Sequence, residues 1–206
     1  MAQPGTPARR TQAERRATTR AALLDAAIAC LVQDGYAGLT TRRVADRAGV
    51  SQGTQMHYFP TRALFVAEAI RHVATELTRE LRSQLGEGPV AAEEQQIERL
   101  LDELWRVHTG PIFQATMELW VAARTDEEIR AAMDDVSRDV TRLIARSAAA
   151  YVPQTMAKPG AGDMLDHALA TMRGLALLRF TGDAEDVARR WTRARRTLLA
   201  LYDRLG

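Results

Sequence analysis

The chain has 206 residues, of which 46% are apolar and 26% are charged, and this composition is typical of a globular protein with a buried core. The first residues contain no apolar signal-type stretch, and no apolar run of about 18 residues occurs, so we expect neither a secretory signal nor a transmembrane helix. The single cysteine, Cys30, lies among apolar residues and is expected to be a buried thiol. These features favour a protein of the reducing cytoplasm.

The charge is unevenly distributed along the chain. Residues 1–62 hold nine arginines and four acidic residues, a net charge of +5, whereas residues 63–206 carry a net charge of −3. The basic N-terminal part is therefore the candidate for binding a polyanion. Such charges are also found on ordinary solvated faces, so the charge alone does not assign a function.

Apolar residues at helical spacing, separated by glycines, prolines and capping residues, divide the chain into about nine predicted helices. No segment has the two-residue alternation of a strand, so the predicted fold class is all-α. A disordered tail is expected at 1–10 and a loop at 153–162. The predicted helices cover about 11–34, 41–48, 52–58, 62–85 and 91–109, one beginning at 111, one beginning at a capping box at 125–128, and then 163–180 and 184–205.

The segment 40–59, TTRRVADRAGVSQGTQMHYF, has the features of two short helices joined by a tight turn. Ala45 is small enough for the point where the two helices cross, and Gly49 suits a turn residue with positive φ. Val50 is expected to turn inward. Ser51 is a good N-cap, and it precedes free N–H groups that favour a phosphate. The pattern predicts a helix-turn-helix.

The second short helix is expected to expose Gln52, Thr54, His57 and Tyr58, whose side chains can hydrogen-bond to base edges and phosphates. A plain helical hairpin with polar outer faces is the alternative. That alternative does not explain why alanine, glycine and a capping serine occur together at these spacings in the basic part of the chain. We therefore favour DNA binding.

The same residues carry a resemblance to a known family. Residues 17–69 are similar to the tetracycline-repressor (TetR) family, through Gly38-Leu39-Thr40-Thr41, Val44-Ala45-Asp46-Arg47-Ala48-Gly49-Val50-Ser51, Gly53-Thr54 and Phe59-Pro60-Thr61-Arg62. The resemblance implies a homodimer that binds a double-stranded DNA operator through its first three helices and a small-molecule effector through its later helices. It implies a DNA-binding domain at 11–60 and an effector-binding and dimerisation domain at 61–206.

Matched by position, the resemblance implies which residues contact DNA. These are Thr41, Arg42, Gln52, Gly53, Thr54, His57, Tyr58 and Arg62. One departure lies at Gln55-Met56, where the family has an apolar residue followed by tyrosine. Because glutamine is a poor core residue, Met56 is expected to take over part of the inward packing, and a tyrosine–phosphate contact would be absent.

Two further groups of residues are candidates for a ligand pocket and a dimer interface. Large aromatic and methionine side chains around a helix break suit an apolar cavity, although each taken singly is more often ordinary core. The ligand candidates are Trp105, His108, Phe113, Met117 and Trp120. Heptad spacing in the last helices predicts a four-helix interface between two chains, with burial inside one chain as the alternative. The interface candidates are Leu165, Leu169, Met172, Trp191, Ala194, Leu198 and Leu201.

No arrangement of residues typical of a catalytic, metal or cofactor site stands out, so we expect no enzymatic activity and no cofactor. The favoured interpretation is a regulator, most often a repressor in this family, that a small apolar or aromatic ligand releases from DNA. One alternative is a helical ligand-binding protein or enzyme without operator-specific DNA binding. Another is a DNA-binding dimer that has no effector.

Overall fold

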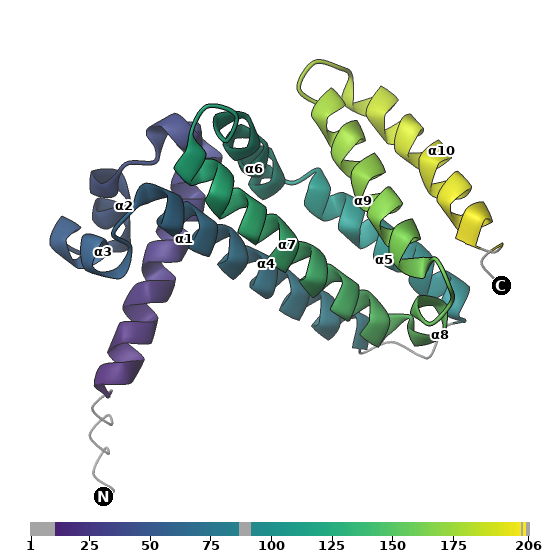
Figure 1. Cartoon of the computed structure of the whole chain (residues 1–206), viewed down its shortest axis with the longest axis horizontal. Coiled ribbons are helices and arrows are strands. Elements are labelled where there is room, and N and C mark those ends of the chain that lie inside the picture. Colours follow the sequence, from purple (N-terminus) through teal and green to yellow (C-terminus); the bar gives the residue numbers. More distant parts are fainter. Residues whose placement is uncertain (1–10, 87–91, 203, 205–206) are drawn as a thin grey trace, which may run out of the picture. The chain divides into compact units, whose positions relative to one another are not determined.

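The computed structural model describes residues 11–86, 92–202 and 204, and these residues contain ten helices and no strand (Figure 1). The all-α fold class is confirmed. The chain divides into two compact units, residues 1–69 and 70–206, and the division falls within one long helix, α4. The helices are α1 Gln12–Gly38, α2 Thr41–Ala48, α3 Gln52–Tyr58, α4 Arg62–Gly86, α5 Glu93–His108, α6 Pro111–Ala122, α7 Glu127–Tyr151, α8 Pro153–Met156, α9 Ala161–Leu178 and α10 Ala184–Tyr202.

The first unit packs α2 against both α1 and α3. Leu23 of α1 and Val44 of α2 have no exposed surface, and the rings of Phe59 and Phe65 lie 4.6 Å apart. The predicted helix over 11–34 is interrupted at Gly35, which has a positive φ of 66°, and a further short helical stretch carries α1 to Gly38. The unit is thus a small core around which three helices and the start of α4 are arranged.

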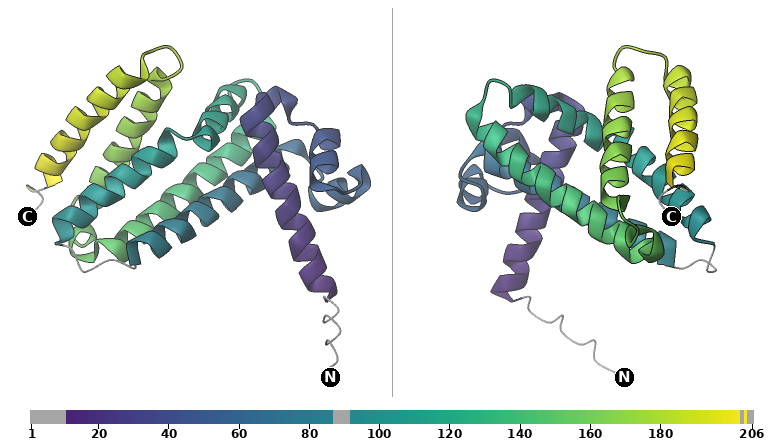
Figure 2. Two further views of the ribbon diagram at one scale, coloured as in Figure 1. Left: turned by 180° about the vertical axis from the view of Figure 1, so that it is seen from behind. Right: turned by 45° about the vertical axis from the view of Figure 1, so that its right-hand side comes forward.

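The second unit contains the antiparallel pair α9 and α10, with α5 packed against α9 (Figure 2). Trp105 of α5 stacks on Trp191 of α10, with ring centroids 4.8 Å apart and an interplanar angle of 12°. Beside this stack, the Arg195 guanidinium lies 3.2 Å from Glu98 and 2.9 Å from Asp102. Apolar stacking and ion pairs together attach α10 to α5.

Three sequence expectations need correction or fall outside the structure. The segment expected to be a loop at 153–162 begins with a short helix, α8, because Pro153 occupies a first-turn position where its missing N–H costs nothing. The N-cap of α7 is Asp126 and not Thr125: the Asp126 carboxylate accepts a hydrogen bond of 3.0 Å from the Ile129 N–H. The tail expected at 1–10 lies outside the described residues. None of the described helices combines the length and the apolar character needed to cross a membrane.

Candidate nucleic-acid interface and ligand cavity

The turn between α2 and α3 has the geometry that its sequence predicts. Gly49 has φ 68° and ψ 32°, and the following Val50 N–H donates to the Ala45 carbonyl at 3.0 Å. The Ser51 hydroxyl accepts a hydrogen bond of 3.1 Å from the Thr54 N–H and so caps α3. The end of α2 and the start of α3 thus satisfy backbone groups within the turn itself, and the two helices are in contact.

Most of the residues predicted to contact DNA lie on the surface of this unit. Thr41, Arg42, Gln52 and Gly53 are exposed, as is His57. Arg42 lies 3.8 Å from Asp46, but 81% of its side chain is exposed, and such a pair contributes little to stability. The Arg42 guanidinium can therefore turn toward a phosphate or a base without loss to the fold.

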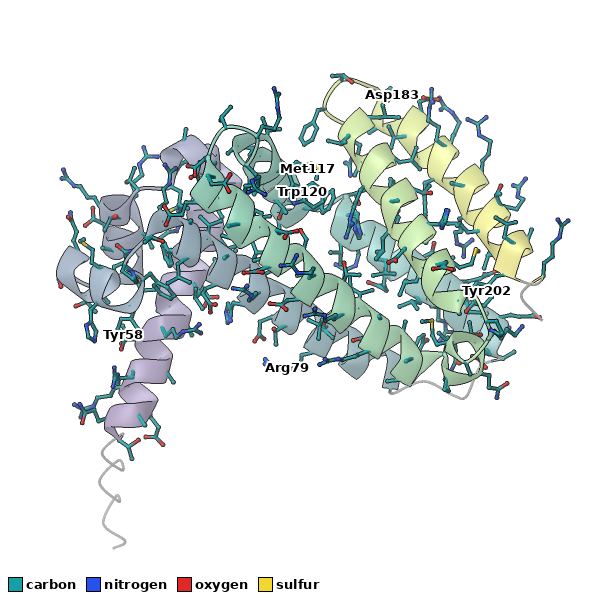
Figure 3. The ribbon with its side chains drawn as sticks, in the orientation of Figure 1. Tyr58, Arg79, Met117, Trp120, Asp183 and Tyr202 are labelled. Carbon is teal, nitrogen blue, oxygen red and sulfur yellow. The ribbon has the colours of Figure 1, made fainter. Side chains whose placement is uncertain are left out.

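Two residues that are predicted to contact DNA also contact other residues of the protein. Tyr58, labelled in Figure 3, is half-buried, with its ring 5.8 Å from that of His57. The Arg62 guanidinium lies 3.9 Å from the centroid of the Tyr36 ring and also donates to the Tyr36 carbonyl. Arginine has five N–H donors, so Arg62 can hold a phosphate while it joins the start of α4 to the end of α1.

Gly53 is a glycine that the fold of this unit does not require. Its φ is not positive, and an added Cβ would meet only the Ser51 hydroxyl, at an ordinary 3.8 Å. A glycine inside a helix costs about 1 kcal/mol relative to alanine. Among the described residues, no contact requires a glycine at this position.

The structure overturns the expected roles of Gln55 and Met56. Gln55 is 3% exposed, whereas Met56 is 57% exposed, so Gln55 and not Met56 points into the core. The physical reason is helix phase: Gln55 lies one turn before the buried Phe59, and residues four apart share a face. The Gln55 Oε1 atom is buried without a hydrogen-bond partner.

The second unit contains a mainly apolar cavity of about 130 Å³, formed by α4, α5, α6, α7 and α9. His108, Phe113 and Trp120 line it, as expected for ligand-binding residues. Trp105 and Met117 do not: Trp105 is stacked on Trp191, and Met117, seen with Trp120 on α6 in Figure 3, is buried outside the lining. The ligand-binding role of the three lining residues stays a prediction.

His108 is the polar group with the most strongly perturbed environment in this cavity. Its pKa is lowered to about 4, mainly by burial; the hydrogen bond to the Leu104 backbone opposes this shift, and the charge of Arg173 contributes to it. The imidazole is therefore neutral at pH 7. The Nδ1 atom lies 2.7 Å from the Leu104 carbonyl, which can only accept, so Nδ1 carries the hydrogen and Nε2 remains an acceptor. The Phe113 ring lies 4.6 Å from the imidazole.

Sequence reasoning did not identify Arg173, which α9 contributes to the cavity lining. Its guanidinium carbon lies 5.6 Å from the centroid of the Trp120 ring. Burial lowers the pKa of Arg173. No local motif marks this position, because Arg173 follows Trp120 by more than 50 residues in the sequence and is brought to the pocket segment only by folding.

The structure places most of the predicted interface residues inside the chain's own core. Ala194 is partly buried and Leu201 is 44% exposed, while the other candidates pack around α5. The buried candidates are Leu165, Leu169, Met172, Trp191 and Leu198. Burial within one chain, the alternative to a dimer seam, accounts for these five residues. The role of the heptad in a dimer interface stays a prediction.

Comparison of the sequence with known proteins supports the helix-turn-helix assignment. Residues 23–69 match the profile of the family described as bacterial regulatory proteins, tetR family. The chain is 30% identical to the HTH-type transcriptional regulator CymR of Pseudomonas putida over 175 residues, which cover 83% of this chain and 84% of that protein.

Solved structures support the same fold. A transcriptional regulator from Rhodococcus sp. Rha1 superposes with a TM-score of 0.63 at 22% identity, covering 89% of this chain and 95% of that one. A regulator from Saccharomonospora viridis, solved in complex with choline, superposes with a TM-score of 0.64 at 17% identity, covering 91% and 96%. The relative from Pseudomonas putida, 30% identical over 83% of this chain, and the matching profile over residues 23–69 show that the chain belongs to the tetR family of bacterial regulatory proteins.

Proposed function

We propose that this transcriptional regulator is a homodimeric repressor whose α2 and α3 bind an operator, and that a small apolar or aromatic ligand in the α4–α9 cavity releases it. The observation that carries the DNA-binding part is Gly53, which is exposed on α3 and is not required by the fold. Regulators of this family generally act by binding DNA, so we propose no enzymatic activity. We also propose that the regulator acts in the bacterial cytoplasm, where its DNA site would be.

The proposed DNA surface combines direct contacts with close backbone approach. Thr41 and Arg42 lie at the start of α2, while Gln52, Thr54 and His57 lie on α3. Donors at such positions reach phosphates and base edges when a short helix enters a major groove. The missing Cβ of Gly53 then lets the backbone of α3 come close to the DNA.

The proposed dimer uses the outer faces of α9 and α10, since their inner faces are already buried. Leu177 is 49% exposed and Leu201 is 44% exposed. Gly174 is exposed in the middle of α9, and a Cβ added there would meet nothing within 4 Å. A second copy of α9 packed close to Gly174 would explain both the glycine and the exposed leucines.

The proposed effector site is the cavity lined by His108, Phe113 and Trp120. Its volume of about 130 Å³ is close to that of a ~150 Å³ protein cavity that binds benzene. A ligand with about one ring therefore fits. The regulator of the same fold from Saccharomonospora viridis holds choline, which supports a small-molecule effector without identifying it.

The test begins with selection, from a random pool, of the DNA that the wild-type protein binds. The affinities of the wild type and of Gly53→Ala for the selected site are then measured by titration. We expect the variant to fold with wild-type or slightly higher stability, because alanine favours the helix and meets no clash. Its affinity for the site should fall about tenfold or more, as for the loss of one recognition contact. Gly162→Ala on α9, where an added Cβ also meets open space, is the matched control. Equal affinity of both variants and the wild type would remove the main support for this surface.

A further inference from the structure

One arginine of the cavity lining, Arg173, has a guanidinium nitrogen that the protein does not pair. The Arg173 side chain is half-buried, and its Nε atom is fully buried without a hydrogen-bond partner. Among the described residues, no carboxylate forms an ion pair with Arg173; Asp166 acts on it only through a longer-range charge effect. An arginine held beside an apolar cavity without an anionic partner bears a desolvation cost that an anion can remove.

The other charged groups of the lining are already paired with each other. Glu103 lies 2.7 Å from Arg106, and both belong to the cavity wall. Arg106 is the more exposed of the two cations in the lining and already has Glu103 as a partner, so Arg173 is the cation better placed to receive a ligand. Arg173 and His108 both line this cavity.

The neighbours of Arg173 define the rest of the ligand. Trp120 lies under the guanidinium, and Phe113 packs at right angles to Trp120, with ring centroids 5.9 Å apart. These rings form an apolar wall next to the charge. A ligand that satisfies the site has an apolar body of about one ring and one anionic group at its end.

We propose that the effector is a small aromatic or similarly compact carboxylate whose carboxylate binds the Arg173 guanidinium while its ring lies against Phe113 and Trp120. The inference rests on the proposed function of the cavity as the effector site. It gives that site a ligand class, and it excludes cationic and uncharged compounds as the preferred ligands. Arginine binds carboxylates through two parallel N–H···O bonds, so the geometry of the anion matters as well as its charge.

The test compares ring-sized probes that differ mainly in charge: benzoate, benzamide and benzylamine. Binding to the full chain is measured by calorimetry at millimolar ligand, and by the change in fluorescence that a ligand against Trp120 produces. We expect benzoate to bind more tightly than the other two probes. In Arg173→Met the ratio of benzoate to benzamide affinity should fall by about 10- to 100-fold, the range for lost charge-assisted hydrogen bonds.

Two further variants make the result decisive. Arg173→Lys keeps the charge, so it should retain part of the preference for benzoate even if Arg173→Met folds poorly. Arg99→Met removes an exposed arginine of α5 outside the cavity lining and should leave the preference unchanged. Equal binding of benzoate and benzamide to the wild type, an unchanged ratio in Arg173→Met, or no binding of any probe would overturn the inference.

Binding to the selected DNA site is measured in parallel, so that failure of this inference and failure of the proposed function can be told apart. A chain that binds its site but does not prefer carboxylates contradicts the ligand class alone. A chain that binds benzoate through Arg173 but has no preferred DNA site contradicts the proposed regulator function, while the ligand class stands.

Discussion

Replacing Gln55 by methionine should stabilise the protein. The Gln55 side chain is 3% exposed, and its Oε1 atom has no partner. A buried polar group without a partner costs about 1–3 kcal/mol, whereas an apolar side chain of similar shape bears no such cost. Methionine has a similar length and flexibility, so the substitution removes the acceptor without a large change in volume. We expect the free energy of unfolding to rise by about 1–2 kcal/mol. This is less than the full ~3 kcal/mol cost of a buried unpaired group, because methionine does not fill the space of glutamine perfectly.

The change is measured by urea unfolding followed by circular dichroism, with the midpoint expected to rise at an unchanged slope. For a chain of this size, about 2–4 °C in Tm accompanies each kcal/mol. Gln52→Met, on the exposed face of the same helix, is the control and should change stability by no more than about 0.5 kcal/mol. If Gln55→Met lowers the free energy of unfolding by more than the control does, the amide oxygen has a partner in solution and the argument from its burial is wrong.

Three other predictions test the proposed surfaces and the cavity. Arg42→Ala and His57→Ala should each weaken operator binding by about 1–3 kcal/mol if the residue contacts a base; wild-type affinity in both folded variants contradicts this assignment. Gly174→Arg, which meets no clash within its own chain, should sediment as a monomer, while Gly162→Arg should not; a dimer in both places the interface elsewhere. Burial lowers the pKa of His108 to about 4 in the folded chain. Between about pH 6.5 and 4, His108 is therefore protonated in the unfolded chain but not in the folded chain. Up to ~3 kcal/mol of the stability present above pH 6.5 is lost as the pH falls through this range. His108→Asn should reduce that loss in urea unfolding at pH 5 and 7, and an unchanged loss assigns it to other groups.

The helix-turn-helix could be predicted because its determinants are local. Gly49 and Ser51 act through backbone φ and through a hydrogen bond three residues away, so their effects do not depend on distant parts of the chain. Gln55 shows where composition misleads. Its polarity favoured an exposed position, but the phase of α3 is set by the turn before it and by Phe59 after it, and Gln55 shares the buried face. Position on the helix outweighed residue type.

The cavity and the dimer face could be predicted only in part, because both depend on which helices meet. His108, Phe113 and Trp120 were found from their clustering in one stretch, but Arg173 lies on a distant helix with no local signal. Trp191 belongs to a heptad, and a heptad shows that one helix face is buried without showing which helix covers it. Here Trp105 of the same chain covers it.

The proposed release of DNA by a ligand requires an element that contacts both the DNA-binding unit and the ligand cavity. Helix α4 has residues in both. Near its start, Phe65 packs against Phe59 of the helix-turn-helix unit. Further along, Ile70 and Val73 line the ligand cavity. A ligand that binds the released state about 100-fold more tightly supplies about 2.7 kcal/mol for the switch. By linkage, operator DNA must then weaken benzoate binding by the same factor. Benzoate titrated with and without the selected DNA site measures this factor directly, and equal affinities would show that the cavity, whatever it binds, is not coupled to the DNA-binding surface.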